Sequence, residues 1–219
     1  EYKYLARPIE LVPSLSDGWP SISEDGLEIT ITLAADSRFA DNANFPNGVG
    51  RAVTAHAVAY SILRHFDDRS PAFASWLWRD VVDGVSDWDG NYDSYPSGIE
   101  VVDDRTIVFR LSQRTPRFLH TLATAYASVI PVESRDIDLN FQTVGSGPYR
   151  LSSIDSERAI LVENENYRSR LFSDALTGQT TPDLASRMST LSGRRLPLIP
   201  RIEVEFVEDP GSRWLAFDN

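Results

Sequence analysis

The chain has 219 residues, of which 42% are hydrophobic and 24% are charged, an ordinary composition for a globular protein. This length fits one large domain or two small ones. The formal net charge of -11 repels phosphate backbones, so the composition argues against nucleic-acid binding. The sequence has no cysteine, which excludes disulfide bonds, thiol catalysis and thiolate metal sites.

A β-hairpin is the first predicted element. In LEITITL, at 27–33, apolar residues alternate with polar ones, as in a strand with one buried face. The preceding SEDG is a turn of the Asp-Gly type, so GWPSISEDGLEITITL, at 18–33, indicates two paired strands. Residues 38–53 are rich in Asn, Gly and Pro and predict a loop.

Two helices are predicted to follow this loop. The hydroxyl of Thr54 can accept a hydrogen bond from an amide of a first turn, so Thr54 is expected to cap a helix over 55–66. Apolar residues recur at helical spacing in that segment and form one stripe. Ser70 and Pro71 repeat the start signal, so a second helix is expected to begin there and to end near Gly84.

Aromatic residues gather in the second predicted helix and in the loop after it. Amphipathic rings can stack on a ligand or line a groove, but they also fill cores. Core packing is the favoured interpretation for the rings of the helix, and both interpretations stay open for the rings of the loop. The helix contributes Phe73, Trp76 and Trp78, and the loop contributes Trp88, Tyr92 and Tyr95.

The rest of the chain mixes strands with helices. IEVVDDRTIVFRLS, at 99–112, predicts two short strands around a turn, and Pro116 opens a third helix over 117–127. The later predicted elements are two strands within 149–167, a loop-like stretch at 168–200, a strand at 201–209 and a helix after Gly211. Because strands and helices do not alternate regularly, the predicted fold class is α+β.

The motif VGSGPYR, at 144–150, could be a phosphate loop or a turn. A phosphate-binding glycine loop needs a following helix whose amides face the anion. Pro148 lacks an amide hydrogen, and the residues after it alternate as in a strand. The motif therefore predicts a turn into a strand, in which Gly145 and Gly147 allow backbone angles closed to other residues.

Residues suited to catalysis or metal binding form no recognisable set. His56 and His65 lie nine positions apart on one predicted helix and His120 lies on another, so no pair faces a common ligand. Paired aspartates occur in turn-like contexts, where Asp bonds its own backbone, and no GxSxG motif is present. We therefore expect no catalytic residue, no bound metal and no cofactor.

Several segments in a fixed order carry a resemblance. They are SDGWPSISEDGLEITITL, TAHAVAYSILR, IEVVDDRTIVFRLSQRTPRFLHTLA, GSGPYRL with ILVENENY, and RIEVEFVEDPGSRWLAFDN. Taken together over 15–219, they resemble the family 5 extracellular solute-binding proteins, the peptide-binding partners of ABC importers. Each motif is weak alone, and their number and order make the resemblance specific.

The resemblance implies a fold of two lobes that close over a ligand, with the first lobe built from two subdomains. Residues 1–145 resemble the smaller subdomain of that lobe, hairpins packed with helices. Residues 146–219 resemble the return strands that lead into the larger subdomain. The chain is thus expected to be an α+β fragment of a periplasmic-binding-protein-like fold, from a protein more than twice as long.

Three substrate-binding residues follow from the resemblance. SPAFASWL is similar to the family helix whose aromatic residue before Ala-Ser faces peptide, and Phe73 holds that position. Aligned without gaps, PRFLHTLATAYASVIP places Thr124 and Tyr126 at another turn near the ligand. The expanded loop at 39–51, and His56 where the family commonly has an acid, depart from the pattern and leave the ligand class open.

The implied function is capture of a peptide or similar small solute by lobe closure, for import through the membrane permease of an ABC transporter. Such a protein is expected to be exported to the periplasm or cell surface, to act as a monomer, and to bind no nucleic acid. A nickel chelate, haem or sugar is the alternative ligand. A carboxylate-based hydrolase, or an interaction module that docks through the loop Trp88–Tyr95, is the remaining alternative.

Overall fold

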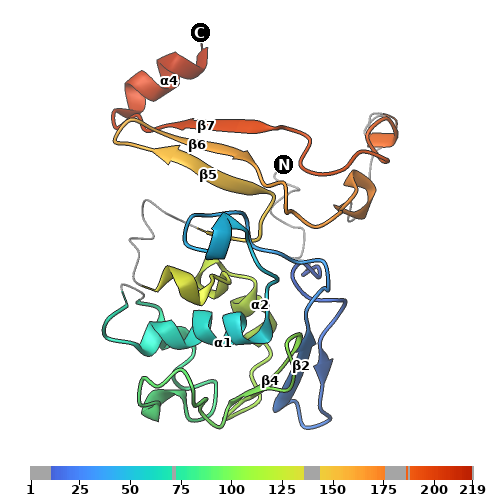
Figure 1. The fold of residues 1–219 in the computed structure, drawn as a ribbon, viewed down its shortest axis with the longest axis vertical. Coiled ribbons are helices and arrows are strands. Elements are labelled where there is room, and N and C mark those ends of the chain that lie inside the picture. Colours follow the sequence, from blue (N-terminus) through green and yellow to red (C-terminus); the bar gives the residue numbers. More distant parts are fainter. Residues whose placement is uncertain (1–10, 71–72, 136–143, 176–185, 187, 219) are drawn as a thin grey trace, which may run out of the picture. The chain divides into compact units, whose positions relative to one another are not determined.

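The computed structural model describes residues 11–70, 73–135, 144–175, 186 and 188–218, which form two compact units (Figure 1). The first unit holds the described parts of Glu1–Ser37 and Ala52–Arg135. The second holds those of Arg38–Arg51 and Asp136–Asn219. Each unit has its own antiparallel sheet, and the assignment of the chain to two subdomains stays a prediction. No helix in the described part of the chain is long and apolar enough to cross a membrane.

The sheet of the first unit has the strand order β1-β2-β4-β3. Both predicted hairpins are confirmed, since Ile22 pairs with Ile29 and Ile99 pairs with Phe109. Gly26 closes the first hairpin at φ +73°, in the left-handed region that glycine enters at low cost. The strands are β1 (Ser21–Ile22), β2 (Glu28–Thr32), β3 (Ile99–Val101) and β4 (Thr106–Arg110).

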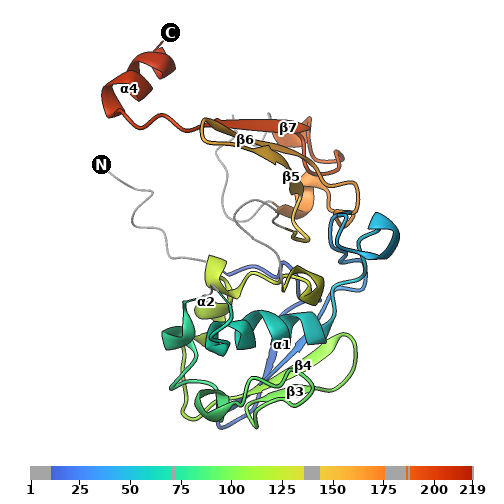
Figure 2. The same cartoon turned by 60° about the vertical axis from the view of Figure 1, so that its left-hand side comes forward.

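Helix α1 (Ala55–Leu63) packs on this sheet against β3 and β4 (Figure 2). The predicted cap is confirmed, because the Thr54 hydroxyl accepts a hydrogen bond from the amide of Ala57 at 3.4 Å. The α-helix ends earlier than predicted and continues as a 3-10 turn over Arg64–Phe66. Nearly every side chain of α1 is buried, so α1 is a central helix with a wider buried surface than one stripe.

The second predicted helix is wrong. Its start at Pro71 lies outside the described residues, the part that is described forms a 3-10 turn at Ser75–Leu77, and another 3-10 turn at Val85–Asp87 follows its predicted end. Backbone pairing explains the difference: Val82 forms a β-bridge with Leu111, and the amide of Asp83 donates to the carbonyl of Arg110 at 3.0 Å. Arg79 and Val82 still donate to the carbonyls four residues earlier, but at Asp83 a hydrogen bond to the end of β4 takes the place of the next helical bond.

The core of the first unit joins these turns to the third predicted helix. Trp78, Phe109 and Phe118 are almost fully buried. The Trp78 and Phe118 rings meet edge to face at 6.3 Å, and those of Phe109 and Phe118 at 5.4 Å. Core packing is therefore confirmed for Trp78. Helix α2 (Phe118–Leu122) is shorter than predicted, because Thr124 is extended at φ -85° and ψ 161°.

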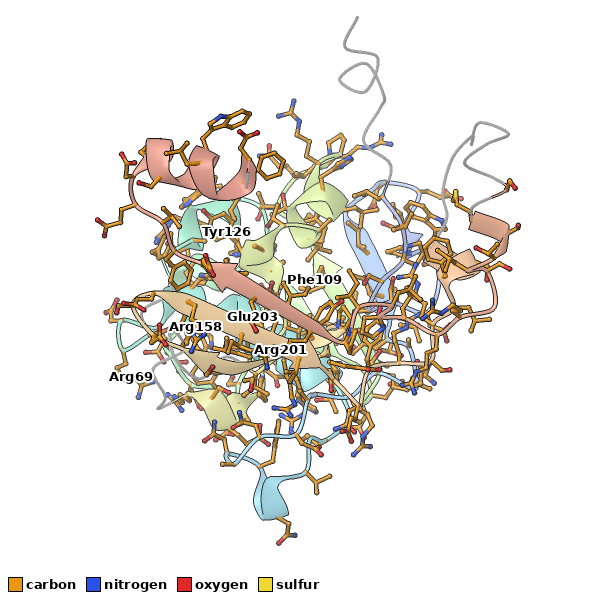
Figure 3. The ribbon with its side chains drawn as sticks, turned by 90° about the horizontal axis from the view of Figure 1, so that it is seen from above. Arg69, Phe109, Tyr126, Arg158, Arg201 and Glu203 are labelled. Atoms are coloured by element: carbon orange, nitrogen blue, oxygen red, sulfur yellow. The ribbon has the colours of Figure 1, made fainter. Side chains whose placement is uncertain are left out.

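The second unit contains strands β5 (Tyr149–Ile154), β6 (Arg158–Glu163) and β7 (Arg201–Glu205), in that order, and helix α4 (Pro210–Asp218). All were predicted, and VGSGPYR does lead into a strand. Gly145 and Gly147 nevertheless lack the positive φ that their role as special turn residues suggested. Arg201 and Glu203 share one face of β7, where the Arg201 Nε donates to Glu203 Oε1 at 2.8 Å (Figure 3).

Candidate functional site

Phe73 and Tyr126 are distant in sequence but adjacent in the first unit. Their rings meet edge to face, with centroids 6.1 Å apart and planes at 80°. Phe73 is 74% exposed and Tyr126, labelled in Figure 3, is 42% exposed. The structure therefore brings two of the predicted binding residues together at the surface. Their contact with a ligand stays a prediction.

Trp76 completes the cluster, which we call the aromatic patch: Phe73, Trp76 and Tyr126. The Trp76 ring lies 6.5 Å from that of Tyr126, at an interplanar angle of 69°, and Trp76 is 66% exposed. Core packing, the favoured interpretation from the sequence, is wrong for Phe73 and Trp76. Trp78 is buried in the core, while Trp76, two positions earlier in the 3-10 turn Ser75–Leu77, stays at the surface.

Thr124 lies next to the patch but uses its hydroxyl locally. Its Oγ1 donates to the carbonyl of Thr121 at 2.7 Å, at the end of α2. Its carbonyl accepts the amide of Ala127 at 3.1 Å, which closes the 3-10 turn Ala125–Ala127 that carries Tyr126. Thr124 thus shapes the turn, and its role in binding a solute stays a prediction.

Buried His65 lies beneath the patch and bonds to both of its segments. Its Nε2 lies 2.9 Å from the carbonyl oxygen of Tyr126, and its Nδ1 lies 3.2 Å from the amide nitrogen of Ala74. Burial lowers the pKa of His65, which the bond to Tyr126 partly opposes. The sequence pattern placed His65 only as one of three scattered histidines, so this role was missed.

The aromatic loop Trp88–Tyr95 packs against other residues of the first unit, to which it belongs. The Tyr92 ring packs on Trp88 at 4.8 Å and on Tyr60 at 5.1 Å, and its hydroxyl donates to Asp67 Oδ2 at 3.0 Å. The Trp88 Nε1 donates to two carbonyls of its own loop, and the Tyr95 hydroxyl lies 2.7 Å from His56 Nδ1. Because the polar groups of these three rings have partners within the first unit, packing is favoured over ligand contact as their role.

Asp67 anchors that loop electrostatically. Its nearly buried carboxylate accepts from Arg69 Nε at 2.8 Å and lies 3.5 Å from Arg135 Nη2. The hydrogen bond from Arg69 lowers the pKa of Asp67 to about 2, against the opposing effect of burial. Burial and the adjacent Asp67 raise the pKa of Tyr92. These groups form a structural ion-pair network beside α1.

In the part of the chain that the structure describes, the aspartates with shifted pKa values do not indicate a catalytic pair. Hydrolysis by two carboxyl groups needs one of them to have a raised pKa. Within the described residues, no group of three or more His, Asp or Glu side chains is arranged to hold a metal ion. The pKa is lowered, by hydrogen bonds, at Asp25, Asp41, Asp67, Asp103, Asp155 and Asp209.

Side-chain hydrogen bonds of Asp41 and Asn166 hold the expanded loop of the second unit in place. Asp41 Oδ1 accepts from the amide of Gly50 at 2.8 Å and from Asn166 Nδ2 at 2.6 Å. These two bonds lower the pKa of Asp41. Asn166 Nδ2 also donates to the carbonyl of Phe39 at 3.1 Å, so the loop is tied to the segment after β6.

Comparison with known proteins identifies relatives of this chain. The sequence model of a protein family, the bacterial extracellular solute-binding proteins, family 5, matches residues 10–219 of this chain. The peptide transport periplasmic protein SapA of Salmonella typhimurium is 28% identical over 175 residues, 71% of this chain and 29% of its own length. The dipeptide-binding protein of Escherichia coli is 26% identical over 211 residues, 87% of this chain and 36% of its own length.

A solved structure agrees with these relatives in fold. Listeria monocytogenes OppA bound to peptide superposes with a TM-score of 0.67 at 21% identity, over 94% of this chain and 36% of that protein. The chain thus spans about a third of the length of the proteins it matches. The predicted resemblance and the α+β, periplasmic-binding-protein-like fold class are both confirmed.

Proposed function

Because the chain belongs to the bacterial extracellular solute-binding proteins of family 5, we propose that its whole protein captures peptides for an ABC importer. The chain contributes residues 1–145 as the smaller subdomain of one lobe and 146–219 as the start of the larger subdomain. The protein acts as an exported monomer and delivers its ligand to a membrane permease. The relatives named for peptides support this choice of ligand.

The aromatic patch is the observation that carries the proposal for this chain. Large apolar side chains gathered at a surface indicate a place that another molecule covers. Phe73 and Trp76 expose 74% and 66% of their surface although rings of this size favour burial. Three rings from two segments offer apolar faces and edges to the side chains and main chain of a peptide.

Binding in this proposal is non-covalent. The rings make contact with the peptide, and closure of a second lobe excludes water and completes the polar contacts. No bond is broken and no cofactor takes part. The aspartates with lowered pKa values are held by local hydrogen bonds, which is a structural role.

Calorimetry on the whole protein with di- to decapeptide libraries tests this function. Phe73→Ala and Trp76→Ala are each expected to weaken peptide binding about tenfold, as for a ring at the centre of an interface. Trp19→Ala is the matched control, since Trp19 is 65% exposed and lies outside the patch. Absence of heat with every peptide, or equal losses in the control, contradicts the proposal.

A further inference from the structure

His65 joins the two segments that carry the aromatic patch. Its Nε2 bonds to the carbonyl of Tyr126 itself, at 2.9 Å. Its Nδ1 bonds to the amide of Ala74, the residue after Phe73, at 3.2 Å. The carbonyl of Ala74 in turn accepts the amide of Leu77 at 3.0 Å, which closes the 3-10 turn that carries Trp76. One imidazole therefore fixes the backbone beneath all three rings.

These partners allow one protonation state of the ring. A carbonyl oxygen only accepts, so Nε2 must carry the hydrogen that bonds to Tyr126. A backbone amide only donates, so Nδ1 must offer its lone pair to Ala74. The neutral Nε2–H tautomer satisfies both bonds. Protonation at Nδ1 would set two donors against each other and break the bond to Ala74.

The surroundings of His65 favour the neutral ring. Its side chain is buried, and the charged group that acts on it is the guanidinium of the adjacent Arg64, which disfavours a second positive charge. The segments of Ala74 and Tyr126 present backbone groups to it. The Tyr126 phenol ring lies toward Phe73 and Trp76. The neutral form is thus the one present in the assembled patch.

We infer that neutral His65 is the positioning residue of the aromatic patch, and that its protonation releases the segment of Phe73 from that of Tyr126. The direction follows from the bonds: the patch is assembled above the pKa of His65 and separates as the pH falls through it. The consequence for solute capture rests on the proposed function. The separation of the rings on protonation of His65 does not depend on the proposed function.

The first test measures the rings without a ligand. Phe73 is replaced by 4-fluorophenylalanine in the whole protein, and its ¹⁹F resonance is followed from about pH 7.5 to about pH 4. Tyr126→Leu provides the reference shift for lost ring contact. The resonance is expected to move toward that reference as the His65 ring titrates. A resonance that stays constant over this range overturns the inference.

Variants separate positioning from general folding. Asn at position 65 can still accept from the amide of Ala74 but carries no titrating group, so His65→Asn is expected to abolish the pH dependence of the ¹⁹F shift. His120→Gln, at an exposed histidine of α2, is expected to retain it. An unchanged titration in His65→Asn contradicts the inference, even if that variant is less stable.

Peptide affinity supplies the second readout. Loss of one buried hydrogen bond predicts about fivefold weaker binding in acid than at neutral pH for the natural protein, and no such change for His65→Asn. Equal pH dependence in the two proteins contradicts the inference. If no peptide binds at any pH, the proposed function fails, and the ¹⁹F titration still decides the role of His65.

Discussion

Asn164 donates a hydrogen bond from its side-chain Nδ2 to the carbonyl oxygen of Gly147, at 2.8 Å. The backbone of Asn164 repeats the link, since its amide donates to the carbonyl of Pro148 at 2.9 Å. Its Oδ1 accepts the amide of Asn166 at 3.0 Å. The buried Asn164 thereby joins GSGPYRL to ILVENENY, two of the segments that carry the resemblance to the family.

Removal of this side chain should destabilise the second unit. Asn164→Ala leaves the Gly147 carbonyl and the Asn166 amide without their partner, which is expected to cost about 1–3 kcal/mol of unfolding free energy. Urea denaturation of the whole protein measures the change. Asn164→Asp is expected to be as harmful, because a carboxylate cannot donate to a carbonyl. Asn91→Ala, at an exposed turn, should have a much smaller effect, and equal losses would contradict this account.

Asp67 should make the stability of the protein fall in acid. Its pKa is lowered to about 2 from an ordinary 3.8, so its contribution is complete above about pH 4 and is lost as the pH falls through the folded value. Because Arg69 is exposed and its charge is screened, we expect about 1–2 kcal/mol in total. Thermal unfolding between about pH 5 and about pH 2 measures this dependence.

Substitution at Asp67 isolates that contribution. Asp67→Asn is expected to lower stability at neutral pH and to make its decline in acid less steep, because position 67 then has no carboxyl group to protonate while the other aspartates with lowered pKa values still titrate. The matched control is Asp68→Asn, at the exposed neighbouring position, which should behave like the natural protein. A decline in Asp67→Asn as steep as in the natural protein would show that another group titrates.

Gly50 should tolerate no side chain. A Cβ atom at this position would collide with the backbone carbonyl oxygens of Phe39 and Ala40 across the expanded loop. Gly50→Ala is therefore expected to lower the unfolding free energy by about 1–3 kcal/mol, measured in urea. Gly147→Ala is the control, since a Cβ there meets no atom within 4 Å. Equal stability of the two variants would contradict the predicted collision.

Local patterns in the sequence were sufficient for the strands and the first helix. Alternation in LEITITL placed β2, and the hydroxyl of Thr54 marked the start of α1, because both signals act between residues close in sequence. The same kind of signal at Ser70 and Pro71 predicted a helix that the described residues do not form. Pairing of Val82 with Leu111 overrides it, and that partner lies outside any local window.

The sequence by itself determined the α+β class, the hairpins and the order of motifs that places the chain in its family, because these depend on short-range periodicity and turn chemistry. Only the tertiary structure decided that Phe73, Trp76 and Tyr126 form one exposed patch. His65 bonds to the carbonyl of Tyr126 and to the amide of Ala74, so it links the two segments of the patch in a way that no spacing rule describes. Long-range hydrogen bonds of this kind exist only once the backbone has folded.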